Sequence, residues 1–309
     1  MAARVALTHA ALFYRDREQY RAQILRFAGE GLADGEAVLI ALPGEQADEI
    51  GARLSGEPGE LVCVDVADLG RNPARIIPEV RAFVDKHPGQ PVRVAAEPIW
   101  PGRSAAEVFE GIRHEALTNL AFRHVPLAIM CAYDITRHAP SVIAAARCTH
   151  SEFVAGGEPV RGAEPPPAPW EIPPECDRPL SPPPPGAESL GYRTDLAPVR
   201  RLVERHARRT RLAAERVADL VLAASEVAAN TLGHTRSGGT FQVWHDEDEI
   251  VCQTEDEGWI DDPLAGRVRR GPDSRGHGLF LVNHVCDLVE MRTGRAGTTV
   301  RMHMRLSPR

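Results

Sequence analysis

Short apolar runs alternate with amphipathic segments along the first half of the chain. Each run is followed by a helical pattern that is long enough for a crossover between parallel strands. This alternation predicts an α/β domain whose mostly parallel sheet is covered by helices. The predicted strands are residues 6–14, 36–42, 61–66, 91–97 and 126–133.

The second half of the chain has a different order of elements. Helical patterns come first, followed by strand-like segments that are separated by a single helix, and this order predicts an α+β two-layer sandwich. The predicted elements are helices at 197–212 and 213–235, strands at 241–246 and 250–255, a helix at 277–290 and a strand at 298–306.

A proline-rich tract separates the two patterns. Residues 158–189 hold 12 of the 26 prolines and show no hydrophobic periodicity, which is typical of an extended polyproline-II linker. The expected organisation is therefore a first domain at 1–155, a linker at 156–190 and a second domain at 191–309.

Composition and charge narrow the class of protein. A net charge of −7 provides no basic surface for nucleic acid, so no direct nucleic-acid contact is expected. The apolar runs are shorter than the ~20 residues that cross a membrane, and no secretion signal is recognisable. These features indicate a cytoplasmic protein without membrane contact. The six cysteines lack the short spacing of zinc or redox motifs and are interpreted as reduced structural thiols.

Polar and aromatic side chains interrupt or follow several predicted strands of the first domain. Because ligands of such sheets bind beyond the carboxyl ends of the strands, these side chains are candidates for a small-molecule sensor pocket. The alternative that they are turn residues and strand caps stays open. For the histidine inside the first strand, a core histidine is the competing interpretation. The candidates are His9, Arg71, Asn72, Glu97, Trp100 and Tyr133.

Three polar residues lie at four-residue intervals in the helix predicted at 213–235. Glu226, Asn230 and His234 share one stripe, because four residues turn a helix by about 400°. A carboxylate can orient a hydroxyl group or a water molecule, and a carboxamide oxygen can coordinate a hard cation such as Mg²⁺. The stripe therefore indicates a functional site.

Two further motifs follow in the second domain. Asp256 and Gly258, in the sequence DEG, end a predicted strand, where a carboxylate can accept a hydrogen bond from an exocyclic amine. Gly276 and Gly278 open the last predicted helix, where free N–H groups and close backbone approach suit a phosphate group.

Four segments of the first domain carry a family resemblance. They are HAALFY, GRNPARIIPEVRAF, EPIWPGRSAAEVFEGIRHEALTNLAF and AYD, within residues 7–150. These segments resemble the MEDS sensory domain, which is shared by the DcmR regulator and by methanogen and methylotroph proteins. The resemblance implies a RecA-like or KaiC-like α/β fold that has lost its ATP loop and senses a small molecule. The sequence agrees, because no G-x-x-x-x-G-K-[ST] loop follows the first strand.

The second domain carries another resemblance, within residues 190–306. The segments SEVAANTLGHT, DEGWIDDP, RGHGLFLVNHVCD and GTTVRM look like the N, G1, G2 and terminal boxes of one ATP-binding fold. Gyrase, histidine kinases and anti-sigma-factor kinases share this Bergerat (GHKL) fold. The short lid between Trp259 and Arg275 is most similar to the anti-sigma branch.

This second resemblance implies a role for each candidate residue. Glu226 would act as the general base on an acceptor hydroxyl, and Asn230 would coordinate Mg²⁺. Asp256 would bind the adenine amine of ATP. The remaining contacts to phosphates and adenine would come from His234, Gly258, Gly276, Gly278 and Thr298.

The expected function is a signal-responsive regulator that binds Mg-ATP and acts as an anti-sigma factor and serine protein kinase. Its expected partner is a sigma factor or an antagonist of an anti-sigma factor, and its expected signal is an unidentified small molecule. Two alternatives stay open, a sensor histidine kinase and a non-catalytic, ATP-dependent binding switch. Against the histidine kinase, His206 lacks a phosphoacceptor context and a proline-rich tract precedes the ATP domain. The sequence also leaves a homodimer open.

Overall fold

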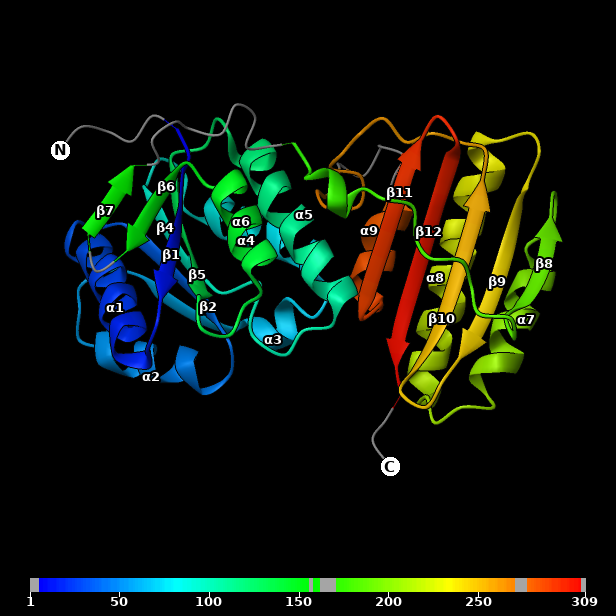
Figure 1. Ribbon diagram of the computed structural model, residues 1–309, viewed down its shortest axis with the longest axis horizontal. Helices are drawn as coiled ribbons and strands as arrows, with labels where there is room; N and C mark the ends of the chain where they lie inside the picture. The colour runs from blue at the N-terminus through cyan, green and yellow to red at the C-terminus, as the bar shows by residue number, and fades with distance from the viewer. Residues whose placement is uncertain (1–5, 156–157, 162–170, 270–276, 307–309) are drawn as a thin grey trace. The chain divides into compact units, whose positions relative to one another are not determined.

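The computed structural model describes residues 6–155, 158–161, 171–269 and 277–306. The chain divides into two compact units, Met1–Cys176 (unit 1) and Asp177–Arg309 (unit 2), and each unit has its own sheet (Figure 1). Within the described ranges, none of the helices combines the length and the apolar character that crossing a membrane requires.

Unit 1 contains a seven-stranded sheet in the order β3-β2-β4-β5-β1-β6-β7. All strands from β3 to β6 in this order run parallel, and only the edge strand β7 is antiparallel to its neighbour. The parallel α/β fold that the sequence predicted is confirmed. The strands are β1 (Thr8–Tyr14), β2 (Ala37–Leu42), β3 (Leu61–Asp65), β4 (Val92–Ala96), β5 (Leu127–Asp134), β6 (Glu152–Ala155) and β7 (Glu158–Arg161).

Helices pack against the sheet of unit 1, because the strands bury side chains on both faces. Leu12 and Val38 belong to an apolar cluster that also contains Ile24 of α1. Alternate residues of β1, beginning with His9, point to the opposite face. The helices are α1 (Arg17–Ala33), α2 (Glu45–Leu54), α3 (Val66–Leu69), α4 (Ile76–Lys86), α5 (Ala105–Phe122) and α6 (Pro140–Thr149), with the 3-10 turns η1 (Pro73–Arg75) and η2 (Pro174–Cys176).

In its described residues, the segment 156–190 contains strand and 3-10 elements, which the extended polyproline-II linker predicted from the sequence did not include. Strand β7 extends the sheet of unit 1 as its edge, a position where Pro159 is tolerated because its missing N–H is not needed there. Cys176 is buried, and its carbonyl oxygen accepts a hydrogen bond from Arg113 Nη1 at 3.3 Å. The segment ends in a strand of unit 2. Both units therefore use part of it for packing.

Unit 2 is the two-layer α+β sandwich that the sequence predicted. Its five antiparallel strands have the order β11-β12-β10-β9-β8, and three helices pack on one face of the sheet (Figure 1). Leu220, Val227, Phe241 and Met302 contribute to the core between the layers. The elements are β8 (Glu188–Tyr192), α7 (Ala197–Ala207), α8 (Ala214–His234), β9 (Gly239–His245), β10 (Glu249–Asp256), α9 (His277–Val285), β11 (Leu288–Gly294) and β12 (Gly297–Arg305).

The helix predicted at 277–290 was too long, because α9 ends at Val285 and β11 follows at once. Asp287 fixes the turn between them. Its N–H donates to the His303 carbonyl oxygen at 3.0 Å, and its carboxylate accepts from Arg216 Nη2 at 2.8 Å. The apolar pattern runs through this turn because the first residues of β11 are buried as well.

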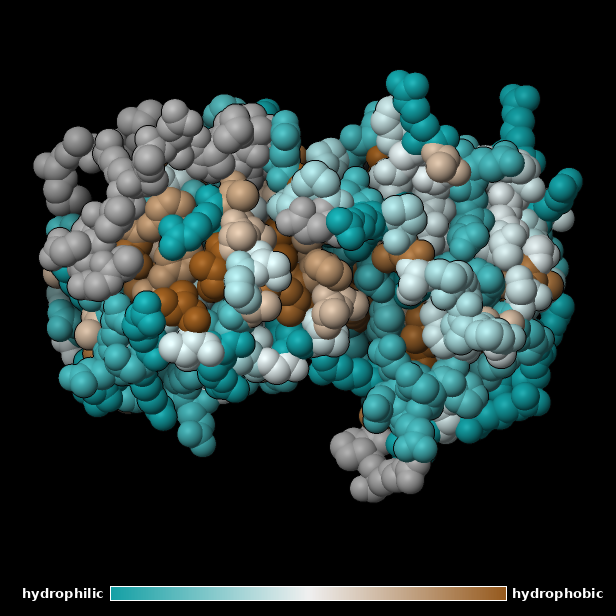
Figure 2. Space-filling view, viewed as in Figure 1, coloured by the Kyte–Doolittle hydropathy of each residue, from teal (hydrophilic) through white to brown (hydrophobic). Residues whose placement is uncertain are grey.

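The outer face of the unit 2 sheet carries polar side chains. Residues before β8 cross this face: Arg301 donates to the Ser181 carbonyl oxygen, and Arg292 Nε donates to the Arg178 carbonyl oxygen at 3.1 Å (Figure 1). The visible surface of this unit is mostly hydrophilic (Figure 2). The same face holds His303, which lies 3.1 Å from a carboxylate oxygen of Glu249 and 3.1 Å from one of Glu290. Burial opposes the charged form of His303, but the two carboxylates outweigh burial and raise its pKa to about 9.

We expect unit 2 to lose stability as the pH rises from about 7 to 10. The folded-state pKa of His303 lies above its usual value of 6.5. The charged His303 therefore contributes its full stabilisation of the folded state below pH 6.5, and this stabilisation is lost as the pH rises through 9. The expected loss is about 2–3 kcal/mol. Hydrogen exchange of the β12 amides in the full chain, corrected for intrinsic rates, measures it. His303→Gln should abolish this pH dependence, whereas His245→Gln, at an exposed position, should leave it unchanged. An unchanged pH dependence in His303→Gln contradicts the assignment.

Candidate functional site

A cavity of about 310 Å³ lies beside α8, the end of β10 and the start of α9 in unit 2. Its wall combines apolar side chains, such as Val227 and Leu279, with a few polar groups, which is typical of a small-molecule site. Several residues that the sequence predicted for a cofactor line this one cavity: Asn230, His234, Asp256, Gly258 and Thr298.

Asp256 is held from two sides at the end of β10. Its Oδ1 accepts from the Gly258 N–H at 2.7 Å, and its Oδ2 accepts from the Thr231 hydroxyl at 2.6 Å. The Thr298 hydroxyl donates to the Gly258 carbonyl oxygen at 2.8 Å and so fixes the following turn. Because each carboxylate oxygen has more than one lone pair, Asp256 can still accept a hydrogen bond from a group in the cavity.

Glu226 and Asn230 lie against the first turn of α9. A Cβ atom added at Gly278 would be 2.7 Å from Glu226 Oε2 and 3.5 Å from Asn230 Nδ2, so glycine preserves the space beside both polar groups. His234, one turn further along α8, is exposed at the edge of the cavity. Asn230 and His234 of the polar stripe therefore line the cavity, and Glu226 lies one turn before Asn230 on α8, against Gly278. Gly276 lies outside the described residues.

In unit 1, Glu97 directly follows β4 and is 2% exposed. The Tyr14 hydroxyl donates to its Oε1 at 3.1 Å, and the Tyr20 hydroxyl donates to its Oε2 at 3.2 Å. Burial raises the pKa of Glu97 to about 7, and the hydrogen bonds from the two tyrosines only partly oppose this shift. Glu97 therefore lies at the strand edge where a sensor ligand was expected, and its carboxyl group titrates near neutral pH.

Arg103 connects two other sensor candidates. Its Nη2 donates to the Arg71 carbonyl oxygen at 3.1 Å, and its guanidinium group lies 3.9 Å from the centre of the Trp100 ring. Asn72 is fully buried and caps η1, where its Oδ1 accepts from the Ala74 N–H at 3.2 Å. The cap interpretation thus accounts for this contact of Asn72, whereas Arg71 and Trp100 both contact Arg103, which was not among the sensor candidates.

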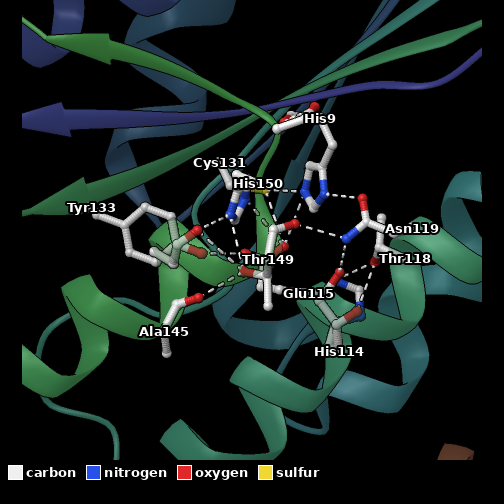
Figure 3. A network of polar contacts seen from close by, with 12 residues as sticks. His9, His114, Glu115, Thr118, Asn119, Cys131, Tyr133, Ala145, Thr149 and His150 are labelled. Atoms are coloured by element: carbon white, nitrogen blue, oxygen red, sulfur yellow. Dashed lines mark hydrogen bonds and ion pairs between the residues drawn. The ribbon is translucent and has the colours of Figure 1, made fainter. Parts of the chain in front are cut away.

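His9 and Tyr133 meet elsewhere, on the face of the sheet that packs against α5 (Figure 3). The Tyr133 hydroxyl donates to Glu115 Oε1 at 2.6 Å, and His9 Nε2 lies 3.1 Å from Glu115 Oε2. We call His9, Glu115, Cys131 and His150 the four-residue cluster; each of them is at most 1% exposed. Burial raises the pKa of the Cys131 thiol well above its usual value and lowers the pKa of His150 to about 3.

Two family matches cover most of both units. Residues 8–151 match the MEthanogen/methylotroph, DcmR Sensory domain (MEDS), and residues 192–304 match the histidine kinase-like ATPase domain. The chain joins a MEDS domain to a histidine kinase-like ATPase domain. It has no match among the curated proteins.

Among solved structures, the chain is similar to a crystal structure of the RsbU and RsbW domains of a Mycobacterium tuberculosis protein. The identity is 18%, the TM-score is 0.31, and the match covers 41% of this chain and 34% of that chain. The matched part is thus about a third of the length of the M. tuberculosis structure.

In both domains, some residues of the sites were not among the candidates predicted from the sequence. Thr231 in the ATPase domain directly follows Asn230, and a polar residue on the buried side of an alanine-rich helix was its only signal. Glu115 and His150 in the MEDS domain are far apart in sequence and have no short spacing to any other member of the four-residue cluster. Their proximity results from the fold alone.

We expect Thr231→Val to weaken adenine-nucleotide binding by roughly ten-fold, because valine keeps the shape but removes the hydrogen bond that orients Asp256. Calorimetric titration of the full chain with a non-hydrolysable ATP analogue and Mg²⁺ measures the affinity. The matched control is Thr299→Val. Thr299 follows the cavity residue Thr298 on β12 but does not itself line the cavity. Equal affinities of the two variants would contradict the role of Thr231.

Proposed function

We propose that the ATPase domain binds Mg-ATP and phosphorylates a serine of a protein that controls a sigma factor. In this proposal the MEDS domain senses a small molecule and alters the activity of the ATPase domain. The proximity of Glu226 and Asn230 beside Gly278 carries the proposal. A site that only bound nucleotide would need the cation ligand but would have no use for a carboxylate that can accept a proton.

The cavity has the features that an adenine nucleotide requires. Asp256 offers carboxylate lone pairs toward an exocyclic amine, and apolar residues such as Val227 and Val300 provide surfaces for a base. The space that Gly278 preserves suits the crowded oxygens of a phosphate chain. When bound, ATP supplies the transferable phosphoryl group, and Mg²⁺ supplies positive charge that stabilises it.

Each side chain then has a distinct task. The amide oxygen of Asn230 is a hard ligand that matches Mg²⁺, and His234 is available at the open edge for a phosphate contact. Glu226 accepts the proton of the serine hydroxyl, which increases the nucleophilicity of the oxygen. Thr298 keeps Gly258 in position beside the base. Gly276 contributes backbone contacts to phosphate in this proposal.

Two observations favour a separate protein as the phosphate acceptor. The described residues 171–192, before the ATPase helices, form η2 and β8 and include no helical hairpin that could present a phosphoacceptor histidine. His206 lies in α7, and its Nε2 lies 2.7 Å from Glu188 Oε2, which ties the ring to β8. A histidine in this position is unsuited to receive a phosphoryl group from the cavity.

We expect Glu226→Gln to lower phosphoryl transfer by about 10²–10⁴-fold with little change in ATP affinity, because glutamine keeps the size but accepts no proton. The full chain, γ-labelled ATP, Mg²⁺ and a lysate of the source organism are incubated together, and labelled bands are tested for acid stability. The expected result is an acid-stable label on a separate protein. Glu215→Gln, at an exposed position in the first turn of α8, is the matched control and should retain transfer.

Other outcomes distinguish the alternatives. An acid-labile label on the chain itself contradicts the serine kinase and indicates a histidine kinase. Measurable ATP binding without any label, in both the unmodified chain and Glu215→Gln, contradicts phosphoryl transfer and indicates a switch that only binds ATP.

A further inference from the structure

The four-residue cluster lies in the MEDS domain and has no task in the function proposed above. His9 comes from β1, Glu115 from α5, Cys131 from β5, and His150 from the end of α6 (Figure 3). One possible ligand atom from each residue lies within 4.8 Å of every other. A core position normally holds an apolar side chain, so four converging polar groups need a physical reason.

The surrounding hydrogen bonds decide which ring nitrogen of His9 carries a proton. Asn119 donates through its Nδ2 to the carbonyl oxygens of Glu115 and Thr149, at 3.1 and 2.7 Å. Its Oδ1 therefore faces His9 Nδ1 at 3.0 Å, and since this oxygen can only accept, Nδ1 must carry the proton. In the neutral ring, the lone pair of His9 Nε2 points into the cluster.

The same reasoning applies to His150. Its Nδ1 lies 2.8 Å from the Ala146 carbonyl oxygen, which can only accept, so Nδ1 carries the proton here as well. The Nε2 atom is completely buried, and none of the described residues forms a hydrogen bond with it. A proton on His9 Nε2 would satisfy the contact between His9 and Glu115, but it would leave the lone pair of His150 unused.

Four of the six separations between the ligand atoms are close to those around a tetrahedral metal ion. Metal–nitrogen and metal–oxygen bonds of about 2.0–2.1 Å and a metal–sulfur bond of about 2.3 Å separate ligand atoms by about 3.3–3.6 Å in a tetrahedron. Glu115 Oε2 lies 3.1 Å from His9 Nε2, 3.4 Å from Cys131 Sγ and 3.7 Å from His150 Nε2. His9 Nε2 lies 3.4 Å from Cys131 Sγ. The remaining ligand-atom separations are at most 4.8 Å, so side-chain movements of about 1 Å bring all four atoms to the distances of one tetrahedral ion.

The charge of the cluster and the hydrogen bonds that orient its side chains are also consistent with a metal site. One thiolate and one carboxylate would neutralise a divalent cation, so the buried site would carry no net charge. The ligands are themselves oriented: Asn119 holds His9, Ala146 holds His150, and Tyr133 donates to the second oxygen of Glu115. Metal ligands in proteins commonly have such outer partners.

We propose that the MEDS domain binds one divalent transition-metal ion through His9, Glu115, Cys131 and His150. The mixed nitrogen, sulfur and oxygen ligands suit Zn²⁺ better than Mg²⁺ or Ca²⁺, which prefer oxygen ligands alone. With four protein ligands the site is closed, so the ion stabilises or reports a conformation and performs no catalysis. It connects the first strand of the domain to the residue that follows its last helix. Metal binding should therefore stabilise the whole MEDS domain.

The test uses Co²⁺ as a spectroscopic probe of the full chain, reduced and freed of metal with a chelator. We expect about one equivalent of Co²⁺ to bind with the visible bands of a tetrahedral ion and a near-ultraviolet band from thiolate-to-Co²⁺ charge transfer. Zn²⁺ should displace Co²⁺ and raise the unfolding temperature of the MEDS domain. Cys131→Ser should remove the charge-transfer band, and His150→Gln, which removes a direct ligand, should weaken Co²⁺ binding by at least about 100-fold, the upper limit for the loss of an outer partner.

Matched controls are Cys148→Ser and His124→Gln, whose side chains are exposed outside the cluster and should leave Co²⁺ binding unchanged. The proposal is overturned if the folded chain takes up less than about a tenth of an equivalent of Co²⁺ or if Cys131→Ser keeps the charge-transfer band. Should the cluster variants fail to fold, X-ray absorption of the Zn²⁺-loaded, unmodified chain decides. One sulfur and three nitrogen or oxygen ligands support the site, and a shell without sulfur overturns it.

Discussion

A polar side chain on the buried face of a sheet needs partners, and this requirement organises both domains. In the MEDS domain, Glu115 projects from α5 toward β5, where Tyr133 donates to it. In the ATPase domain, Asp256 at the end of β10 accepts from Thr231 on α8. Each carboxylate thereby ties a helix to a strand. Since an unpaired buried charge costs several kcal/mol, a shift of α5 would be costly for the buried Glu115, whereas a shift of α8 would free the half-buried Asp256 from the hydrogen bond that orients it.

The fold was largely predictable because it depends on local patterns. Uniformly apolar runs such as 37–42 are typical of strands that are buried on both faces, and the structure has β2 there. The pattern was insufficient where one apolar run served two elements, as in α9 and β11, since only the tertiary contacts of Asp287 end the helix. Strand β8 was missed because it pairs with a partner about fifty residues later, which no local pattern encodes.

The candidate site was predictable to the extent that its residues share one element. Glu226, Asn230 and His234 follow helical spacing, so their common side was evident from the sequence. The sensor candidates come from several loops and strands. In the structure they lie in three separate places, around Glu97, around Arg103 and around Glu115. The sequence selected His9 and Tyr133 from the surroundings of Glu115 but not Glu115, Cys131 or His150, because Cys131 lies inside a strand and points into a sheet face rather than following a strand end. Only the pairing of β1 with β5 brings His9 and Cys131 together.

Strand β8 forms an edge of the ATPase sheet, and the chain just before it covers the outer face of that sheet through Ser181 and Arg178. The ATPase fold thus begins near Asp177, inside the proline-rich tract. This limits how evolution can exchange the sensor. A recombination junction upstream of residue 177 keeps the sheet edge and its cover, whereas a junction after the last proline of the tract removes the cover. A sensor exchanged together with residues 177–187 would therefore leave the ATPase sheet without the chain that covers its outer face.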